Sequence, residues 1–238
     1  MMKFPLLKIG GLIPRYPIIQ GGMALRVSTA PLAAAVANAG GIGIIAATGM
    51  AVDELKNEIR AARNLTKGII GINIMFAVRQ FASLVHAAIE EKIDLIFTGA
   101  GFSRDIFKWG KEAGIPVVSI ISSAKLAMRA EKQGASAVVA EGVEAGGHLG
   151  TDRSIEEILP GAKGVQMATR FVLSVECAVA EAFKQMYLKA REDDVMIISS
   201  PVGMPGRALR NPFAAKIMEG NAPRPENCSL CLKECSGE

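Results

Sequence analysis

The feature that most constrains the fold is a repeated order of short apolar run, glycine-containing loop and helix-like segment. The apolar runs are bounded by turn residues, which suits strands buried on both faces of a sheet. Each unit spans roughly 20 to 30 residues, enough for the helical crossover that joins two parallel strands. We therefore predict an α/β protein with parallel strands at residues 17–19, 42–46, 69–74, 94–97, 116–120, 137–140 and 164–168.

Helix signals lie between these strands. The hydroxyl of Ser28 or Thr29 is expected to cap a helix that has Pro31 in its first turn and ends at Asn38. Asp53 is expected to cap the next helix, which carries apolar residues four positions apart on one face. The predicted helices after the first cover residues 54–63, 80–91, 104–113, 124–133 and 176–191.

Polar residues that follow the strands decide between an open doubly wound sheet and a barrel. In a doubly wound sheet the ligand site is concentrated at one switch point, whereas all strand ends of a barrel face one site. The polar positions here are spread along the chain, which favours the barrel. They are Gln20, Asn73, Thr98, Ser122 and His148.

The strand count is one short of a barrel. After residues 137–140 the next credible strand is 164–168, and no strand-plus-helix unit lies between Ile158 and Gly161. The prediction is therefore a TIM (β/α)8-type barrel that lacks about one βα unit between Pro160 and Gly161. Either a unit has been lost or the barrel is open on this side.

Composition restricts the class of protein. A chain of 238 residues, 50% of them hydrophobic, can bury a large core as one domain. The net charge of +4 is small and no basic run occurs, so nucleic acid is not an expected partner. Neither a secretory signal nor an apolar run of membrane-spanning length is found, so no membrane partner and a cytoplasmic location are expected.

The domain expectation is a barrel at residues 1–212 and a cysteine-containing tail at 213–238. The helix at 176–191 is read as an insertion that could pack on the barrel or on a second copy of the chain, which would give a homodimer. Cys228, Cys231 and Cys235 in the tail would need a fourth ligand, such as Cys177 or Glu234, to hold zinc or an iron–sulfur cluster. A reduced tail is the favoured interpretation, so no metal ligand is assigned.

Residues 140–150, AEGVEAGGHLG, place an ionisable imidazole in a glycine-rich loop directly after a buried strand. Glycines let the backbone approach a ligand closely, and histidine titrates near neutral pH. His148 is one of two histidines in the chain. A single loop histidine is often only a surface or capping residue, so the surrounding motifs decide its interpretation.

These motifs together resemble the nitronate monooxygenase (2-nitropropane dioxygenase) family. The family consists of FMN-dependent TIM barrels and is related to the flavin-dependent enoyl-acyl-carrier-protein reductases. The resemblance extends to about Arg210. The segments that carry it, in the order of the family, are residues 17–23, 40–45, 71–75, 98–101, 141–150 and 164–171.

The resemblance implies an FMN site and a role for each matching position. His148 would be the catalytic residue that faces the flavin. A Gly-Gly pair that helps to hold the phosphate in the family is absent, because it belongs to the missing unit. The implied cofactor-binding residues are Gly21, Gly22 and Met23 against the ring, Asn73 by a hydrogen bond, Glu141 and Gly146 at ring or ribityl atoms, and Gln166, Ala168 and Thr169 at the phosphate end.

The resemblance also implies a reaction. Electrons would pass from an alkyl nitronate to FMN and then to dioxygen, which yields a carbonyl compound and nitrite. His148 could remove the proton next to the nitro group or hold the nitro oxygens. The alternative is a flavin reductase that takes hydride from NAD(P)H and reduces an enoyl thioester or a quinone, because residues 98–101 and 140–148 resemble the enoyl reductases equally well. A second alternative is a truncated, non-catalytic barrel.

Overall fold

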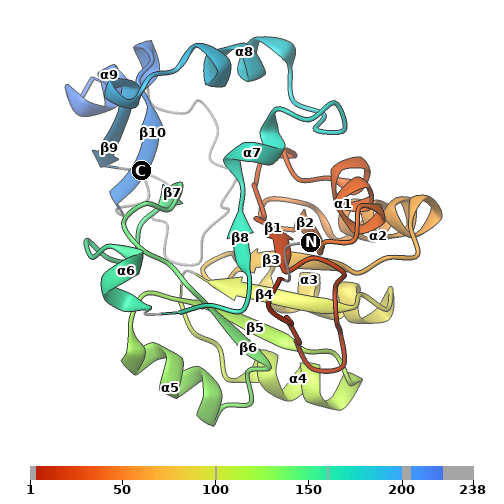
Figure 1. The fold of residues 1–238 in the computed structure, drawn as a ribbon. Coiled ribbons are helices and arrows are strands. Elements are labelled where there is room, and N and C mark those ends of the chain that lie inside the picture. Colours follow the sequence, from red (N-terminus) through yellow and green to blue (C-terminus); the bar gives the residue numbers. More distant parts are fainter. Residues whose placement is uncertain (1–3, 100, 160, 200–204, 222–238) are drawn as a thin grey trace.

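The computed structural model describes residues 4–99, 101–159, 161–199 and 205–221 (Figure 1). Its centre is a sheet of five parallel strands that are neighbours in the order of the sequence. This arrangement confirms the predicted parallel α/β fold. The five strands are β2 (Gly43–Ala46), β3 (Ile70–Met75), β4 (Leu95–Gly99), β5 (Val117–Ile121) and β6 (Ala137–Ala140).

Two further parallel strands extend this sheet beyond β2. β1 (Ile18–Gln20) pairs with β8 (Val165–Met167). β1 also joins β2, because the Gln20 amide donates to the Ile42 carbonyl at 3.0 Å and the Ile42 amide donates to the Ile18 carbonyl at 3.0 Å. The strands therefore follow one another as β8, β1, β2, β3, β4, β5 and β6.

The barrel is not closed, since no pairing between β6 and β8 occurs within the described ranges. The gap between β6 and β8 lies where one βα unit is predicted to be missing. Pro160 itself lies outside the described residues. The two strands at the gap expose apolar side chains: Val138 of β6 is 40% exposed and Val165 of β8 is 47% exposed. A strand and helix in the gap would cover such positions in a complete barrel.

Alternating side chains of the strands build two cores. On the inner face Ile19, Ile44, Phe97 and Val118 pack together, and Ile9 from the amino-terminal segment joins them. On the outer face the alternate residues of the same strands pack under the helices. At Gly43 a Cβ would lie 1.8 Å from the Ala33 carbonyl oxygen, so glycine is needed for helix α1 to approach β2.

Five helices cover the outside of the sheet, from α1 and α2 at one end to α4 and α5 at the other (Figure 1). Two predicted caps are wrong. The Ala30 amide at the start of α1 donates to the Glu58 carboxylate of α2 at 2.6 Å. The Ser28 hydroxyl instead accepts a hydrogen bond from the Met23 amide in the preceding loop. Helix α2 begins before Asp53. The helices are α1 (Ala30–Asn38), α2 (Val52–Leu65), α3 (Phe81–Glu90), α4 (Asp105–Ala113) and α5 (Ala124–Lys132).

The carboxyl-terminal part adds elements that strand–helix periodicity does not predict. The predicted helix at 176–191 is shorter, because Cys177 is buried against α1 and the helix begins only afterwards. A three-stranded antiparallel sheet has the order β7, β10, β9. The elements are β7 (Gly147–His148), α6 (Ile155–Ile158), α7 (Thr169–Val172), α8 (Glu181–Lys189), β9 (Val195–Ser199), β10 (Pro205–Leu209) and α9 (Pro212–Met218), with a 3-10 turn at Glu192–Asp194.

None of the helices in the described part of the chain has the length and hydropathy that crossing a bilayer requires. The cysteines of the predicted tail, Cys228, Cys231 and Cys235, lie outside the described residues.

Candidate active site

The carboxyl end of β1 meets the ends of β3 and β8. Gly22 lies against Asn73 so closely that a Cβ at position 22 would be 2.3 Å from the Asn73 Cβ. The Gly21 amide donates to the Met167 carbonyl at 2.7 Å, and a Cβ on Gly21 would be 3.0 Å from the Ala168 Cβ. Predicted cofactor-binding residues from three separate strands are thus brought together.

The loop after β1 is held by Gln20, which is fully buried. Its side-chain nitrogen donates to the Ser28 hydroxyl at 2.8 Å and to the Ile44 carbonyl at 2.9 Å, and its oxygen accepts from the Ile44 amide at 3.2 Å. The Met23 amide donates to the same Ser28 hydroxyl at 3.0 Å. The Met23 side chain packs against the buried cluster that contains Leu32 of α1. The backbone of the loop at Met23, and not this side chain, therefore faces the mouth of the barrel.

Gln166 lies in the middle of β8, in register with Ile19 of β1. Directly paired residues share one face of a sheet, so Gln166 faces the barrel interior with Ile19. Its Oε1 is buried and has no hydrogen-bond partner among the described residues. Buried polar atoms are normally satisfied, so this one is a candidate contact for a bound group. Thr169 opens α7 and is exposed.

A cavity of about 390 Å³ lies at the carboxyl ends of β5 and β6. This volume is within the range of small-molecule sites, about 300–1,000 Å³. His148 and Glu141 both line the cavity, together with the hydroxyl residues Ser119 and Ser122. Its apolar wall includes Phe102, above which the Arg129 guanidinium of α5 lies at 4.3 Å from the ring centre.

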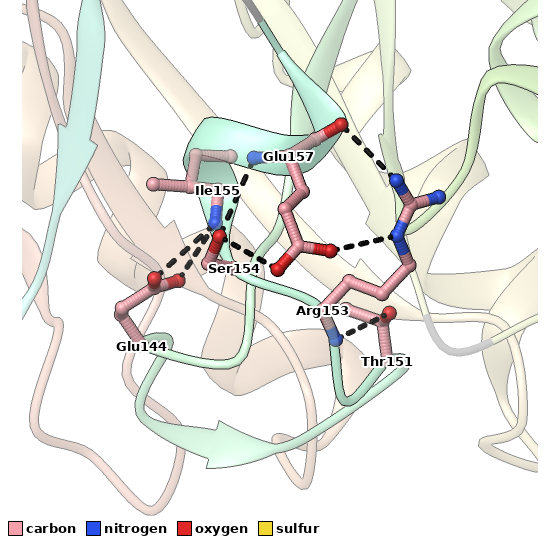
Figure 2. Close-up of polar contacts among 6 residues, drawn as sticks. All are labelled: Glu144, Thr151, Arg153, Ser154, Ile155 and Glu157. Carbon is pink, nitrogen blue, oxygen red and sulfur yellow. Dashed lines mark hydrogen bonds and ion pairs between the residues drawn. The ribbon is translucent and has the colours of Figure 1, made fainter.

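Residues 141–150, here called the His148 loop, are fixed to α6 on one side (Figure 2). The Glu144 carboxylate accepts from the Ile155 amide at 3.0 and 3.2 Å, at the first residue of α6. The Val143 amide donates to the Arg153 carbonyl at 2.8 Å. Figure 2 also shows Arg153 beside Glu157, with Nε 3.2 Å from the carboxylate. These contacts hold the loop next to α6, and none of them was foreseen in the sequence.

Glu141 is the half-buried acid of the cavity. Its amide donates to the Ile121 carbonyl at 2.8 Å, which continues the pairing of β6 with β5. Burial raises the pKa of the Glu141 carboxyl, and a hydrogen bond from the Gly150 amide partly opposes this shift. Because Gly150 lies at the other end of the His148 loop, Glu141 joins the two ends.

The raised pKa of Glu141 predicts how stability depends on pH. The stabilising contribution of a carboxyl whose folded pKa is raised is present below its unfolded pKa and is lost as the pH rises through the folded pKa. Glu141→Gln is therefore expected to gain stability relative to wild type between pH 4 and pH 7. Urea denaturation at the two pH values measures this difference. The exposed Glu156→Gln is the control, and equal behaviour of both variants would contradict the assignment.

The predicted site residues form two groups in the structure. Gly21, Gly22, Asn73 and Ala168 meet at the ends of β1, β3 and β8, and Gln166 faces the interior below them. The second group, Glu141 and His148, lines the cavity at β5 and β6. Gly146 belongs to the His148 loop, and no heavy atom lies within 4 Å of the place where its Cβ would stand.

Candidate contacts for the expected FMN are present at its ring end and only in part at its phosphate end. At the expected ring end Gly22 packs directly on Asn73, with no room for a Cβ between them, and at the expected phosphate end Gln166 carries an unsatisfied buried oxygen. The gap between β6 and β8 is where the missing unit would add backbone N–H groups for a phosphate. Ala168 and Thr169 remain on the β8 side of that gap.

The chain matches the family model described as "Nitronate monooxygenase" in three segments, residues 7–93, 75–160 and 152–234. The second and third segments overlap at 152–160, next to the predicted position of the missing unit. The chain is 30% identical to a Mycobacterium tuberculosis octahydro-1H-indene-4-carboxyl-CoA dehydrogenase, over 94% of this chain and 70% of that protein. That alignment spans 253 residues, more than the 238 of the chain, so the relative contains residues that are missing here.

Two further similarities cover most of the chain. A probable nitronate monooxygenase of Staphylococcus aureus is 27% identical, over 87% of this chain and 79% of that protein. The solved structure of FabK from Thermotoga maritima superimposes with a TM-score of 0.81 at 36% identity, over 87% of this chain and 75% of that one. The family model covers nearly the whole of the described fold, and the chain belongs to the nitronate monooxygenase family.

Proposed function

We propose that the protein is an FMN-dependent oxidoreductase that oxidises alkyl nitronates with dioxygen to carbonyl compounds and nitrite. The observation that carries the proposal is the cavity that brings His148 and Glu141 together at the carboxyl ends of β5 and β6. Active sites of barrels lie at this end of the strands. Membership of the nitronate monooxygenase family supports the choice of substrate.

His148 is the proposed catalytic residue. Its imidazole can donate a hydrogen bond to the oxygens of the nitronate, or remove the proton next to the nitro group of a neutral nitroalkane and so form the nitronate. Glu141 keeps the two ends of the loop together through Gly150. Phe102 and Leu126 give the cavity an apolar wall, which reduces access of water.

FMN, when bound, supplies the acceptor for the electrons of the substrate. Gly21, Gly22, Asn73, Gln166 and the other residues implied by the family resemblance would hold it. The backbone of the loop after β1 would lie against the ring, because its side chains are directed elsewhere. Gln166 would satisfy its buried oxygen on the cofactor side of β8.

A second candidate reaction is the reduction of an enoyl thioester or quinone with NAD(P)H. The observation that favours a thioester substrate is the 30% identity to a protein named as a carboxyl-CoA dehydrogenase. Both candidates use the same cavity, and they differ in the molecule that delivers electrons to the flavin.

Anaerobic stopped-flow mixing separates the two candidates. The protein is loaded with FMN and mixed with an alkyl nitronate, or with NADPH or NADH, while the visible absorbance of the flavin is followed. Rapid bleaching by the nitronate alone is the expected result. Rapid bleaching by NAD(P)H, with no reaction toward the nitronate, would replace the first candidate by the second.

A further inference from the structure

We infer that Arg207 of β10 is a positioning residue for His148. It acts from the β9–β10 hairpin, outside the strands that form the barrel. The inference rests on the proposed catalytic role of His148, and it concerns how the His148 loop is held in place for that role.

The Arg207 guanidinium spans two carbonyl groups of the His148 loop. Its Nη2 donates to the Val143 carbonyl oxygen at 2.5 Å, and its Nε donates to the Ala145 carbonyl oxygen at 3.2 Å. A planar guanidinium has its donors in a fixed fork, so two bonds of this kind define both the distance and the orientation of the loop. The two carbonyls belong to the residues just before the Gly146–Gly147 pair.

The backbone of the hairpin holds the residues on the other side of that pair. Gly206 is in register with His148, and Arg207 is in register with Gly147. The Leu149 amide donates to the Pro205 carbonyl at 2.9 Å, and the Leu149 side chain is buried. Strand β10 therefore forms hydrogen bonds with the loop both before and after the two glycines that precede His148.

The charge of Arg207 is directed to the loop rather than to an acid. The residue is half-buried, and no carboxylate lies within ion-pair distance of it in the described part of the chain. Removal of the guanidinium would leave two carbonyl oxygens without these charge-assisted bonds. Glu144 would still fix the loop to α6 from the other side, so the loop would lose its alignment with β10 and keep its attachment to α6.

The test uses the FMN-loaded full chain and the electron donor that reduces it in stopped flow. Arg207→Met removes both bonds, and Arg207→Lys keeps the charge but replaces the fork by a single donor group. The matched control is Arg210→Met, since Arg210 is exposed near the end of the same strand. We expect kcat to fall about 10–100-fold in Arg207→Met, because a displacement of about 1 Å has this effect on catalysis. KM and FMN affinity are expected to stay close to wild type, and the melting temperature is expected to fall only by the effect of the two lost bonds. In the control all parameters should stay close to wild type.

A double-mutant cycle with His148→Ala tests whether Arg207 acts through the histidine. If it does, Arg207→Met has no further effect on kcat in the His148→Ala background. An equal loss in both backgrounds would overturn the inference, and so would an unchanged kcat in Arg207→Met when His148→Ala is impaired. If His148→Ala itself retains full turnover, the proposed function fails instead, and the two failures are thereby distinguished.

A second readout does not depend on turnover. The chain contains two histidines, so NMR spectra of the imidazole rings show one signal set from His148 and one from His86. His86 of α3 contacts Trp109 of α4, with 4.5 Å between the ring centres and the rings tilted by 50°, and it serves as the internal reference. Arg207→Met should shift or broaden the His148 signals and leave those of His86 unchanged. Unchanged His148 signals would contradict the positioning role.

Discussion

Replacement of His148 by alanine is expected to lower kcat by about 10²–10⁴-fold, the usual contribution of a general acid–base residue. FMN binding should persist, because the residues at Gly22, Asn73 and Gln166 belong to other strands. Steady-state oxygen consumption with a neutral nitroalkane, which must lose a proton to a base before it is oxidised, measures turnover, and fluorescence quenching on titration with FMN measures binding.

Two controls make the His148 experiment specific. His86→Ala removes the other histidine, whose ring contacts Trp109 of α4 and does not line the cavity, and should retain turnover. His148→Gln keeps a side chain that can form hydrogen bonds but cannot act as an acid or base at neutral pH. A His148→Ala protein that binds FMN and turns over at the wild-type rate would contradict the assignment.

Gly22→Ala is expected to abolish most FMN binding. The added Cβ would lie 2.3 Å from the Asn73 Cβ and 2.8 Å from its Cγ, atoms close to the backbone of β3. Relief of this overlap must move the loop after β1 away from the end of β3, and overpacking of this kind destabilises a protein by about 1–3 kcal/mol. We expect FMN affinity to fall about 100-fold, since both displaced elements belong to the proposed ring site. Fluorescence titration and urea denaturation measure the two effects.

The control for Gly22→Ala is Gly11→Ala, at a glycine whose Cβ would meet nothing within 4 Å. A second variant, Gly22→Ala combined with Asn73→Gly, removes the atoms that collide. It should regain stability without regaining full FMN affinity, because the Asn73 amide is lost. Normal FMN binding by Gly22→Ala alone would show that the cofactor does not use this contact.

The parallel part of the fold could be predicted because its signals are local. The apolar runs at 42–46 and 69–74 are short, and each is followed by a glycine or polar loop and a helix pattern; they correspond to β2 and β3. The same periodicity predicts that one βα unit is missing, since no such run lies between Ile158 and Gly161. The structure agrees, because β6 and β8 are not paired with each other in the described part of the chain.

Contacts between distant residues could not be predicted in this way. The first turn of α1 looks like a site for a hydroxyl cap, yet the Ala30 amide is satisfied by Glu58, which lies 28 positions later. The Ser28 hydroxyl is occupied by Gln20 and Met23. Periodicity describes one element at a time, so it does not show which side chain of another helix reaches a free backbone group.

The candidate site also combines local features that the sequence shows with distant contacts that it does not show. A glycine-rich loop with a histidine after a buried strand is visible in the sequence, and the structure places His148 and Glu141 on one cavity. Arg207 carries no signal of its own, because an arginine in a short strand is a common surface residue. Its relation to the loop arises only from the pairing of β7 with β10, which joins residues about 60 positions apart.

We propose that the strand ends of this open barrel hold a flavin. The visible absorbance spectrum of the purified full chain after incubation with FMN and removal of unbound cofactor tests it most directly. We expect the two bands of oxidised flavin at one FMN per chain, with a clear loss of both in Gly22→Ala. A colourless protein that cannot be loaded with FMN would contradict the account and favour a barrel without catalytic function.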